Sequence, residues 1–241
     1  MVCLHGFLGR GSDWCDFRWP GVDLIPMDWM DSGDASTLSE IGGLICRKAK
    51  RTVIERFGTG SAPVRKILMG YSLGGRVGLH ALLDQPDFWD GAILISTHPG
   101  LKTEEERTSR LSADEAWARR LERGSWRDFL EAWNAQPVFN ARPDSSPREI
   151  APYPTPILVQ ALRAWSLGKQ TDLRPRLPEF KRSLLWLTGQ EDEKFSLLAE
   201  NAATLSPGGT HRILPHSAHR APWENREAFC SAVEHYLKAG I

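Results

Sequence analysis

Two hydrophobic patterns alternate along the chain. Apolar residues recur at intervals of three and four over 37–57, 76–83 and 224–238, which predicts amphipathic helices there. Patterns that suit strands, most of them short apolar runs, lie at 2–4, 22–27, 66–70, 91–96, 183–188 and 210–215. Because buried strands that alternate with helices form parallel sheets covered on both faces, the pattern predicts an α/β protein with a mostly parallel, doubly wound sheet.

The alternation is interrupted by a helical segment. A capping box at Thr103-x-x-Glu106 predicts one helix to about residue 123, and Ser125 begins a second helix to about residue 135. Thr155 is interpreted as the N-cap of a third helix that ends at Gly168, with proline at its first helical position. We therefore expect a core made of residues 1–100 and 181–241, and a helical lid insertion at residues 101–180 above one end of the sheet.

Composition narrows the class of protein. The 241 residues include 30 Lys plus Arg and 30 Asp plus Glu, which argues against a nucleic-acid-binding protein. No uncharged apolar run approaches the roughly 18 residues of a membrane-spanning helix, and the N-terminus lacks a signal-peptide pattern. The four cysteines are scattered, which predicts neither disulfides nor a metal site. We expect a cytoplasmic protein without membrane insertion, and no obligate protein partner is evident.

The segment Gly70-Tyr71-Ser72-Leu73-Gly74 matches the motif G-x-S-x-G. It joins a predicted strand to a predicted helix, where a sharp turn lifts the serine hydroxyl to the edge of the sheet. Glycines are needed on both sides because the turn leaves little room for side chains. Ser72 is therefore the candidate nucleophile or base.

A reactive serine needs a base, and the base needs an acid that orients it. With this motif the chain order is serine, then aspartate or glutamate, then histidine. Asp192 follows the strand at 183–188 and His219 follows the strand at 210–215, so both are expected at the edge where such sheets bind ligands. The alternatives in the same loops are His216 for the base, and Glu191 or Glu193 for the acid.

An oxyanion formed at this edge needs backbone donors. The expected donors are the N–H of Leu73, directly after the serine, and the N–H of Phe7, in the loop that follows the first strand. Arg76 lies one turn after Ser72 on the same helix face and would suit either an anionic substrate or a structural ion pair.

Two features of the predicted lid allow both a structural and a binding role. Arg107 and Arg110 share one helix face, which on a Glu-rich helix is more often a solvated surface. Trp126, Phe129 and Trp133 recur at helical spacing, which suits the core of the lid, with Trp133 as a candidate lining residue of a pocket.

Taken together, these segments resemble one known family, the α/β-hydrolase-fold synthases of menaquinone biosynthesis, which make 2-succinyl-6-hydroxy-2,4-cyclohexadiene-1-carboxylate (SHCHC). The resemblance spans most of the chain, and its more specific motifs lie outside the serine turn. The motifs are His5-Gly6-Phe7-Leu8-Gly9, Gly70-Tyr71-Ser72-Leu73-Gly74-Gly75-Arg76, His98-Pro99-Gly100-Leu101, Gln136-Pro137-Val138-Phe139 and Asp192-x-Lys194-Phe195.

The resemblance implies an α/β-hydrolase fold and a lyase that needs no cofactor or metal. The substrate would be a tricarboxylate, 2-succinyl-5-enolpyruvyl-6-hydroxy-3-cyclohexene-1-carboxylate, which loses pyruvate. Ser72, activated by His219 and Asp192, would remove a ring proton, and the N–H groups of Phe7 and Leu73 would hold the oxyanion. The substrate-binding residues would be Tyr71, Arg76, Arg110 and Trp133.

The chain also departs from the family pattern. The segment after the second strand begins with Asp28-Trp29 instead of Pro-Gly-His-Gly, and a lid arginine expected near Tyr153 has no clear counterpart. Two other readings remain open. One is a serine hydrolase that forms an acyl-enzyme at Ser72 on an ester, thioester or C–C bond, and the other is a non-catalytic binding module on the same fold.

Overall fold

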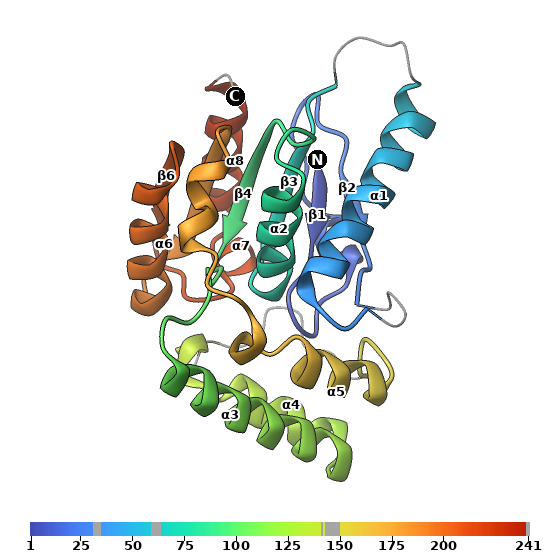
Figure 1. Cartoon of the computed structure of the whole chain (residues 1–241), viewed down its shortest axis with the longest axis vertical. Coiled ribbons are helices and arrows are strands. Elements are labelled where there is room, and N and C mark those ends of the chain that lie inside the picture. Colours follow the sequence, from blue (N-terminus) through green and yellow to red (C-terminus); the bar gives the residue numbers. More distant parts are fainter. Residues whose placement is uncertain (31–34, 59–63, 141, 143–149, 240–241) are drawn as a thin grey trace.

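The predicted apolar runs form one six-stranded sheet in the order β2-β1-β3-β4-β5-β6, and every neighbouring pair is parallel (Figure 1). The computed structural model describes residues 1–30, 35–58, 64–140, 142 and 150–239. The strands are β1 (Val2–Leu4), β2 (Ile25–Met27), β3 (Ile67–Tyr71), β4 (Gly91–Ile95), β5 (Ser183–Gly189) and β6 (Gly208–Leu214). The mostly parallel, doubly wound sheet expected from the sequence is therefore confirmed.

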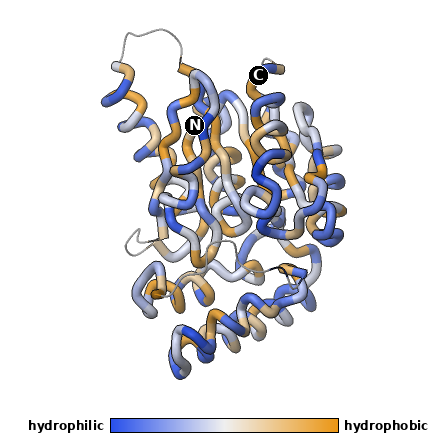
Figure 2. The backbone as a smooth tube through the Cα atoms, turned by 180° about the vertical axis from the view of Figure 1, so that it is seen from behind, coloured by the Kyte–Doolittle hydropathy of each residue, from blue (hydrophilic) through white to orange (hydrophobic). Residues whose placement is uncertain are grey.

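Alternate residues of the inner strands β1, β3, β4 and β5 face two separate cores. In β3, Leu68 joins a core with helices α1 (Leu38–Phe57), α2 (Leu73–Asp84) and α6 (Glu193–Leu205). Its neighbours Ile67 and Met69 join the opposite core, with helix α8 (Arg226–Lys238) and the aromatic rings between residues 14 and 19. Because both faces are covered, the strands read as continuous apolar runs, and the tube in Figure 2 is largely hydrophobic through the sheet.

Three longer helices lie between β4 and β5 in the chain. These are α3 (Glu104–Arg123), α4 (Trp126–Asn134) and α5 (Thr155–Ala164), and they lie beyond the carboxyl ends of the strands (Figure 1). We refer to residues 101–180 as the helical block. Thr103 and Glu106 form the predicted capping box, and the Ser125 hydroxyl accepts from the Asp128 N–H at 3.1 Å.

Two details of the predicted helices are wrong. Thr155 lies in the first turn of α5 rather than at its N-cap, which is Pro154, and α5 ends at Ala164. Gly168 instead lies in a short 3₁₀ helix, η3 (Leu167–Lys169), where a Cβ atom would come within 2.6 Å of the Arg107 carbonyl oxygen. The glycine thus serves the close approach of this turn to α3 and does not end α5.

The C-terminal helix is also divided. The predicted helix 224–238 is preceded by a short helix, α7 (Ala221–Glu224), and the two are separated at Asn225. Asn225 has φ −139° and ψ 78°, and its side-chain oxygen accepts from the Ala228 N–H at 3.1 Å. The amide side chain therefore caps α8 and interrupts the helical pattern. The remaining 3₁₀ helices are η1 (Gly11–Trp14), η2 (Pro137–Phe139) and η4 (Arg174–Glu179).

The strand order reverses beside β1. After β1 the chain moves outward to β2, and it then returns to β3 on the other side of β1. The loops after β1 and β3 therefore leave the sheet next to each other in opposite directions, which opens a crevice at the carboxyl edge. Among the helices that the structure describes, none is long and apolar enough to cross a membrane.

At this edge Gly74 packs closely against the end of β1. A Cβ atom there would lie 2.4 Å from the His5 carbonyl oxygen and 2.6 Å from the Leu4 carbonyl oxygen. We predict that Gly74→Ala lowers the free energy of unfolding by about 2 kcal/mol or more, because the backbones must separate. Urea denaturation measures the change.

The matched control is Gly43→Ala, within helix α1. A Cβ atom at Gly43 would meet only the end of the Arg47 side chain, at 3.4 Å. That variant should raise the free energy of unfolding by about 0.5–1 kcal/mol, because alanine is the better helix former. Equal stabilities of the two variants would show that the turn at Gly74 has room to relax.

Candidate active site

Ser72 occupies a strained turn between β3 and α2. Its φ of 52° and ψ of −113° are unusual for a residue with a side chain. The turn is tight, since a Cβ at Gly70 would lie 2.7 Å from the Gly74 carbonyl oxygen, and one at Gly75 would lie 1.8 Å from Thr97 Oγ1. The Ser72 N–H donates to the Ile95 carbonyl at 2.9 Å, so the turn is also tied to β4. The hydroxyl is thereby presented at the carboxyl edge of the sheet.

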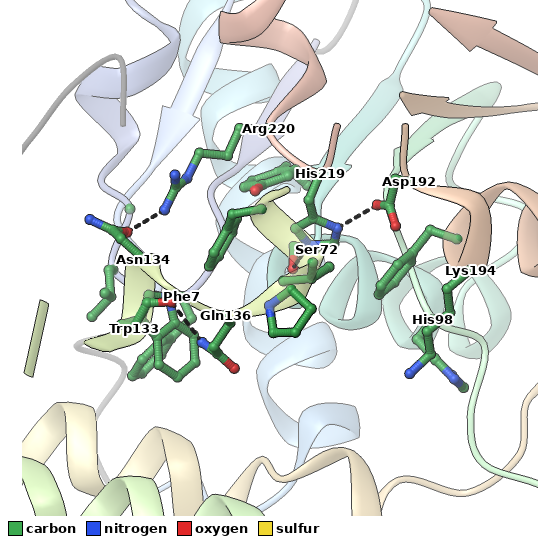
Figure 3. A pocket seen from close by; sticks show the side chains of 18 of the residues that line it. Phe7, Ser72, His98, Trp133, Asn134, Gln136, Asp192, Lys194, His219 and Arg220 are labelled. Carbon is green, nitrogen blue, oxygen red and sulfur yellow. Dashed lines mark hydrogen bonds and ion pairs between the residues drawn. The ribbon is translucent and has the colours of Figure 1, made fainter. Parts of the chain in front are cut away.

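A chain of hydrogen bonds extends from Ser72 through His219 to Asp192 (Figure 3). His219 Nε2 lies 3.1 Å from Ser72 Oγ, and His219 Nδ1 lies 2.7 Å from Asp192 Oδ2. Because the carboxylate accepts the Nδ1 proton, Nε2 is left to accept the serine proton. The arrangement can therefore generate a serine alkoxide.

The alternative residues for the base and the acid are not part of this chain of hydrogen bonds. His216 and Glu193 are exposed, and the Glu191 carboxylate accepts hydrogen bonds from Asn140 Nδ2 and Arg142 Nε, both at 2.8 Å. His219 and Asp192, in contrast, are only 5% and 4% exposed. The structure thus brings together the three residues that chain order predicted, and their catalytic roles remain a prediction.

Aromatic rings enclose the imidazole of His219. The rings of Phe195, Tyr71 and Phe139 lie 4.5, 5.6 and 5.9 Å from it, measured between centroids. This apolar packing limits the rotation of the imidazole and keeps water away from its hydrogen bonds, which strengthens them. Asp192 directly precedes α6, so its negative charge lies near the positive end of the helix dipole.

The predicted oxyanion donors lie on the two segments that flank the crevice, which are the loop after β1 and the start of α2. Leu73 is the first residue of α2, so its N–H has no acceptor within the helix. Phe7 follows β1 in a turn that is closed by the hydrogen bond from the Gly9 N–H to the Gly6 carbonyl at 3.0 Å. Phe7 and Ser72 line the same cavity. The two N–H groups thus lie on segments that border one site.

This cavity has a volume of about 550 Å³ and lies between the sheet edge and the helical block. A smaller cavity of about 100 Å³ shares Phe7, Ser72, Arg110 and Trp133 with it and reaches Arg76. The Trp133 ring packs against that of Phe7 at a centroid distance of 4.8 Å. Of the predicted binding residues, Tyr71, Arg110 and Trp133 therefore line the main cavity, and Arg76 lines the smaller one.

Arg76 and Arg110 place two positive charges beside the cavities. Arg76 is 7% exposed, and its Nε and Nη2 donate to Gln170 Oε1 at 2.6 Å and to the Trp165 carbonyl at 2.9 Å. Burial lowers the pKa of Arg76 to about 9, and the charge of Arg110 acts in the same direction. Arg110 forms an ion pair with Asp114 at 2.8 Å. An anion bound here would offset the cost of holding these cations together.

Comparison with known proteins agrees with this architecture. A model of the alpha/beta hydrolase family matches residues 1–232. The chain belongs to the α/β hydrolase family.

Its relatives include proteins named 2-succinyl-6-hydroxy-2,4-cyclohexadiene-1-carboxylate synthase. The one from Serratia proteamaculans is 30% identical and aligns over 98% of this chain and 92% of its own. The one from Pectobacterium atrosepticum is 32% identical and aligns over 98% of this chain and 93% of its own. The predicted resemblance to these synthases is thereby confirmed over nearly the whole chain.

Solved structures show the same relationship. The structure titled MenH from S. aureus has a TM-score of 0.84 and 26% identity, and covers 99% of this chain and 93% of its own. A thermophilic esterase from Thermogutta terrifontis, at 20% identity, has a TM-score of 0.73 and covers 99% and 89%. The esterase supports the α/β-hydrolase fold alone.

Three lining residues of this α/β hydrolase had no role assigned from the sequence: Lys194, Arg220 and His98. Lys194 belongs to the motif that carries Asp192, and Arg220 follows His219, so proximity to the triad was the available signal. The Arg220 guanidinium lies 3.8 Å above the Phe139 ring and donates to Asn134 Oδ1. It therefore links the loop of His219 to the helical block.

His98 is a buried, neutral member of the cavity wall. Its Nδ1 accepts from the Gly100 N–H at 3.0 Å, and Figure 3 shows the side chain close to Lys194. Burial lowers the pKa of His98 to about 3, and the charges of Arg76 and Lys194 act in the same direction.

The lowered pKa predicts an acid-sensitive fold. Between pH 6.5 and about 3, the unfolded chain protonates His98 while the folded protein does not, so stability is complete above pH 6.5 and falls with pH. His98→Asn keeps an acceptor for Gly100. When the pH is lowered from 7 to 5, the free energy of unfolding of this variant should fall by about 2 kcal/mol less than that of the wild type. Urea denaturation at the two pH values measures both changes. Equal losses would mean that His98 is protonated in the folded protein.

Proposed function

We propose that this chain is an SHCHC synthase, which eliminates pyruvate from 2-succinyl-5-enolpyruvyl-6-hydroxy-3-cyclohexene-1-carboxylate. The observation that carries the proposal is the hydrogen-bonded chain of Ser72, His219 and Asp192 in a cavity that also holds Arg110. The identity to named synthases along nearly the whole chain supports it.

The reaction begins with proton removal by Ser72. His219 Nε2 accepts the hydroxyl proton while the serine oxygen takes the ring proton next to the succinyl carbonyl. Asp192 holds the Nδ1 proton and stabilises the imidazolium that forms. The serine thus acts as a base and forms no bond to carbon.

The electron pair then moves through the ring. The pair of the broken C–H bond forms a new ring double bond, the existing double bond shifts by one position, and the C–O bond to the enolpyruvyl group breaks. Pyruvate leaves as its enolate, which takes up a proton, and the His219 imidazolium loses its extra proton, so the starting state of the three residues is restored. As the first bond breaks, negative charge develops on the succinyl carbonyl oxygen, where the N–H groups of Phe7 and Leu73 stabilise it.

The charge of the substrate accounts for the cations. Its carboxylates pair with Arg110, and with Arg76 through the smaller cavity, while Tyr71 and Trp133 contact the ring. No step requires a cofactor or metal, and the helical block acts as a lid that excludes water. The partner is thus a small tricarboxylate rather than nucleic acid, a membrane or an obligate protein, and the reaction takes place in the cytoplasm.

Removal of the serine hydroxyl tests the mechanism. We expect Ser72→Ala to lower kcat for pyruvate release by about 10³-fold or more, because the base is lost. The assay follows pyruvate from freshly generated substrate, beside a short-chain nitrophenyl ester. Near-normal pyruvate release by the variant would exclude Ser72 as the base.

The same assay separates the alternative function. Ester cleavage without pyruvate above the spontaneous rate would instead support a serine hydrolase that forms an acyl-enzyme at Ser72. Ser72-dependent pyruvate release with negligible ester cleavage supports the synthase.

The substrate charge generates a second prediction. Arg110→Met should raise KM about 10- to 100-fold, because a charge-assisted bond to a carboxylate contributes about 1.5–3 kcal/mol. Arg119→Met is the matched control, since Arg119 lies on the same helix and also pairs through Nε with a carboxylate at 2.8 Å. Arg119 is absent from the lining of the cavities, so its KM should not change. An equal KM in both variants would assign Arg110 to the surface of α3.

A further inference from the structure

The loop after β1 is held in place by a contact from the helical block. Tyr153, just before α5, is 6% exposed, and its hydroxyl lies 3.0 Å from both His5 Nε2 and Asp28 Oδ1. His5 is fully buried and is separated from Phe7 only by Gly6. One hydroxyl group thus joins three segments that are distant in the sequence.

Ring packing and backbone contacts strengthen this junction. The His5 ring lies nearly parallel to those of Trp29 and Tyr153, at centroid distances of 5.3 and 5.9 Å. The Trp29 Nε1–H donates to the His5 carbonyl at 3.1 Å. On the far side of the loop, the Arg10 guanidinium lies 5.1 Å from the Tyr153 ring centre and donates to the Pro152 carbonyl.

Asp28 anchors the junction to the sheet. It directly follows β2, and its Oδ1 also accepts from the Gly11 N–H at 2.8 Å. Burial and the negative charge of Asp28 raise the pKa of Tyr153, so the hydroxyl keeps its proton and donates to the carboxylate. The hydrogen bond from Tyr153 to Asp28 thus joins the helical block to the end of β2.

We propose that Tyr153 and Asp28 are positioning residues that hold the loop at 5–9 so that the Phe7 N–H points at the developing oxyanion. The inference rests on the proposed function through this role of Phe7. It gives the helical block a part in the chemical step, because the block supplies Tyr153. Neither Tyr153 nor Asp28 lines the cavity with Ser72, so they act through the loop rather than on the substrate.

The test is Tyr153→Phe, which removes the hydroxyl and keeps the ring. A displaced donor weakens stabilisation of the transition state more than binding of the substrate, so kcat should fall about tenfold with KM within twofold of the wild type. Asp28→Ala should act in the same way. The double variant should lose no more kcat than the more affected single variant, because both changes break the same hydrogen bond.

Tyr236→Phe is the matched control. Tyr236 is also 6% exposed, and its hydroxyl donates to the Ser183 carbonyl at 2.9 Å, at the opposite end of β5 from the site. This variant should lose a similar amount of thermal stability and keep its kcat. The inference would be overturned if Tyr153→Phe kept the wild-type kcat or showed only a rise in KM. It would also be overturned if both tyrosine variants lost kcat equally.

A measurement that needs no substrate separates the two proposals. Hydrogen–deuterium exchange of the peptide covering the loop at 5–9 should be faster in Tyr153→Phe than in the wild type or Tyr236→Phe. If the wild type releases no pyruvate, the proposed function fails, and the kcat comparison on the nitrophenyl ester tests the loop. Unchanged exchange in Tyr153→Phe would overturn the inference whatever the reaction.

Discussion

The site depends on the close packing of the turn after β3 against the end of β1. Gly74 allows the backbone of this turn to approach the carbonyl oxygens of Leu4 and His5 within a distance that no side chain would permit. That approach holds Ser72 at positive φ and brings the loop of Phe7 beside it. The backbone strain at Ser72 persists because the packing on both sides leaves it no other conformation. The hydrogen bonds of His219 and Asp192 complete a geometry that the backbone has already defined.

The site holds a buried positive charge beside a second one, although burial of a charge in the protein interior is unfavourable. The chain has no net charge, yet Arg76 is buried and Arg110 lies close enough to lower its pKa. The Gln170 amide and the Trp165 carbonyl satisfy the hydrogen bonds of Arg76 without cancelling its charge. The nearby Asp114 carboxylate acts on the pKa of Arg76 in the direction opposite to Arg110. A buried cation in a region of low dielectric attracts a further carboxylate strongly, since water does not screen the interaction. The polar contacts of the helical block thus favour an anionic ligand.

Local sequence signals predicted most of the fold and the triad. Six predicted strand patterns correspond to six strands, and the G-x-S-x-G turn and the order of Asp192 and His219 identified three residues that meet in space. These features were accessible because strand period, glycine geometry and the carboxyl edge of a parallel sheet are local or topological rules. The junction of His5, Asp28 and Tyr153 was not predicted, because Tyr153 is more than a hundred residues from the other two in the chain. The role of Gly168 was misread for a related reason, since it depends on the close approach of the Arg107 carbonyl, which is distant in the sequence.

The helical block leaves the sheet after β4 and returns to it at β5, and these two strands are direct neighbours with an unbroken register from Gly91–Ser183 to Ile95–Leu187. The block is therefore an insertion between two adjacent strands and contributes no strand to the sheet. A segment of another length could be inserted between the same two strands without changing which of their residues pair. Evolution can thus exchange the helical block while it keeps the arrangement of Ser72, His219 and Asp192 intact, and a protein engineer can graft at the same two points.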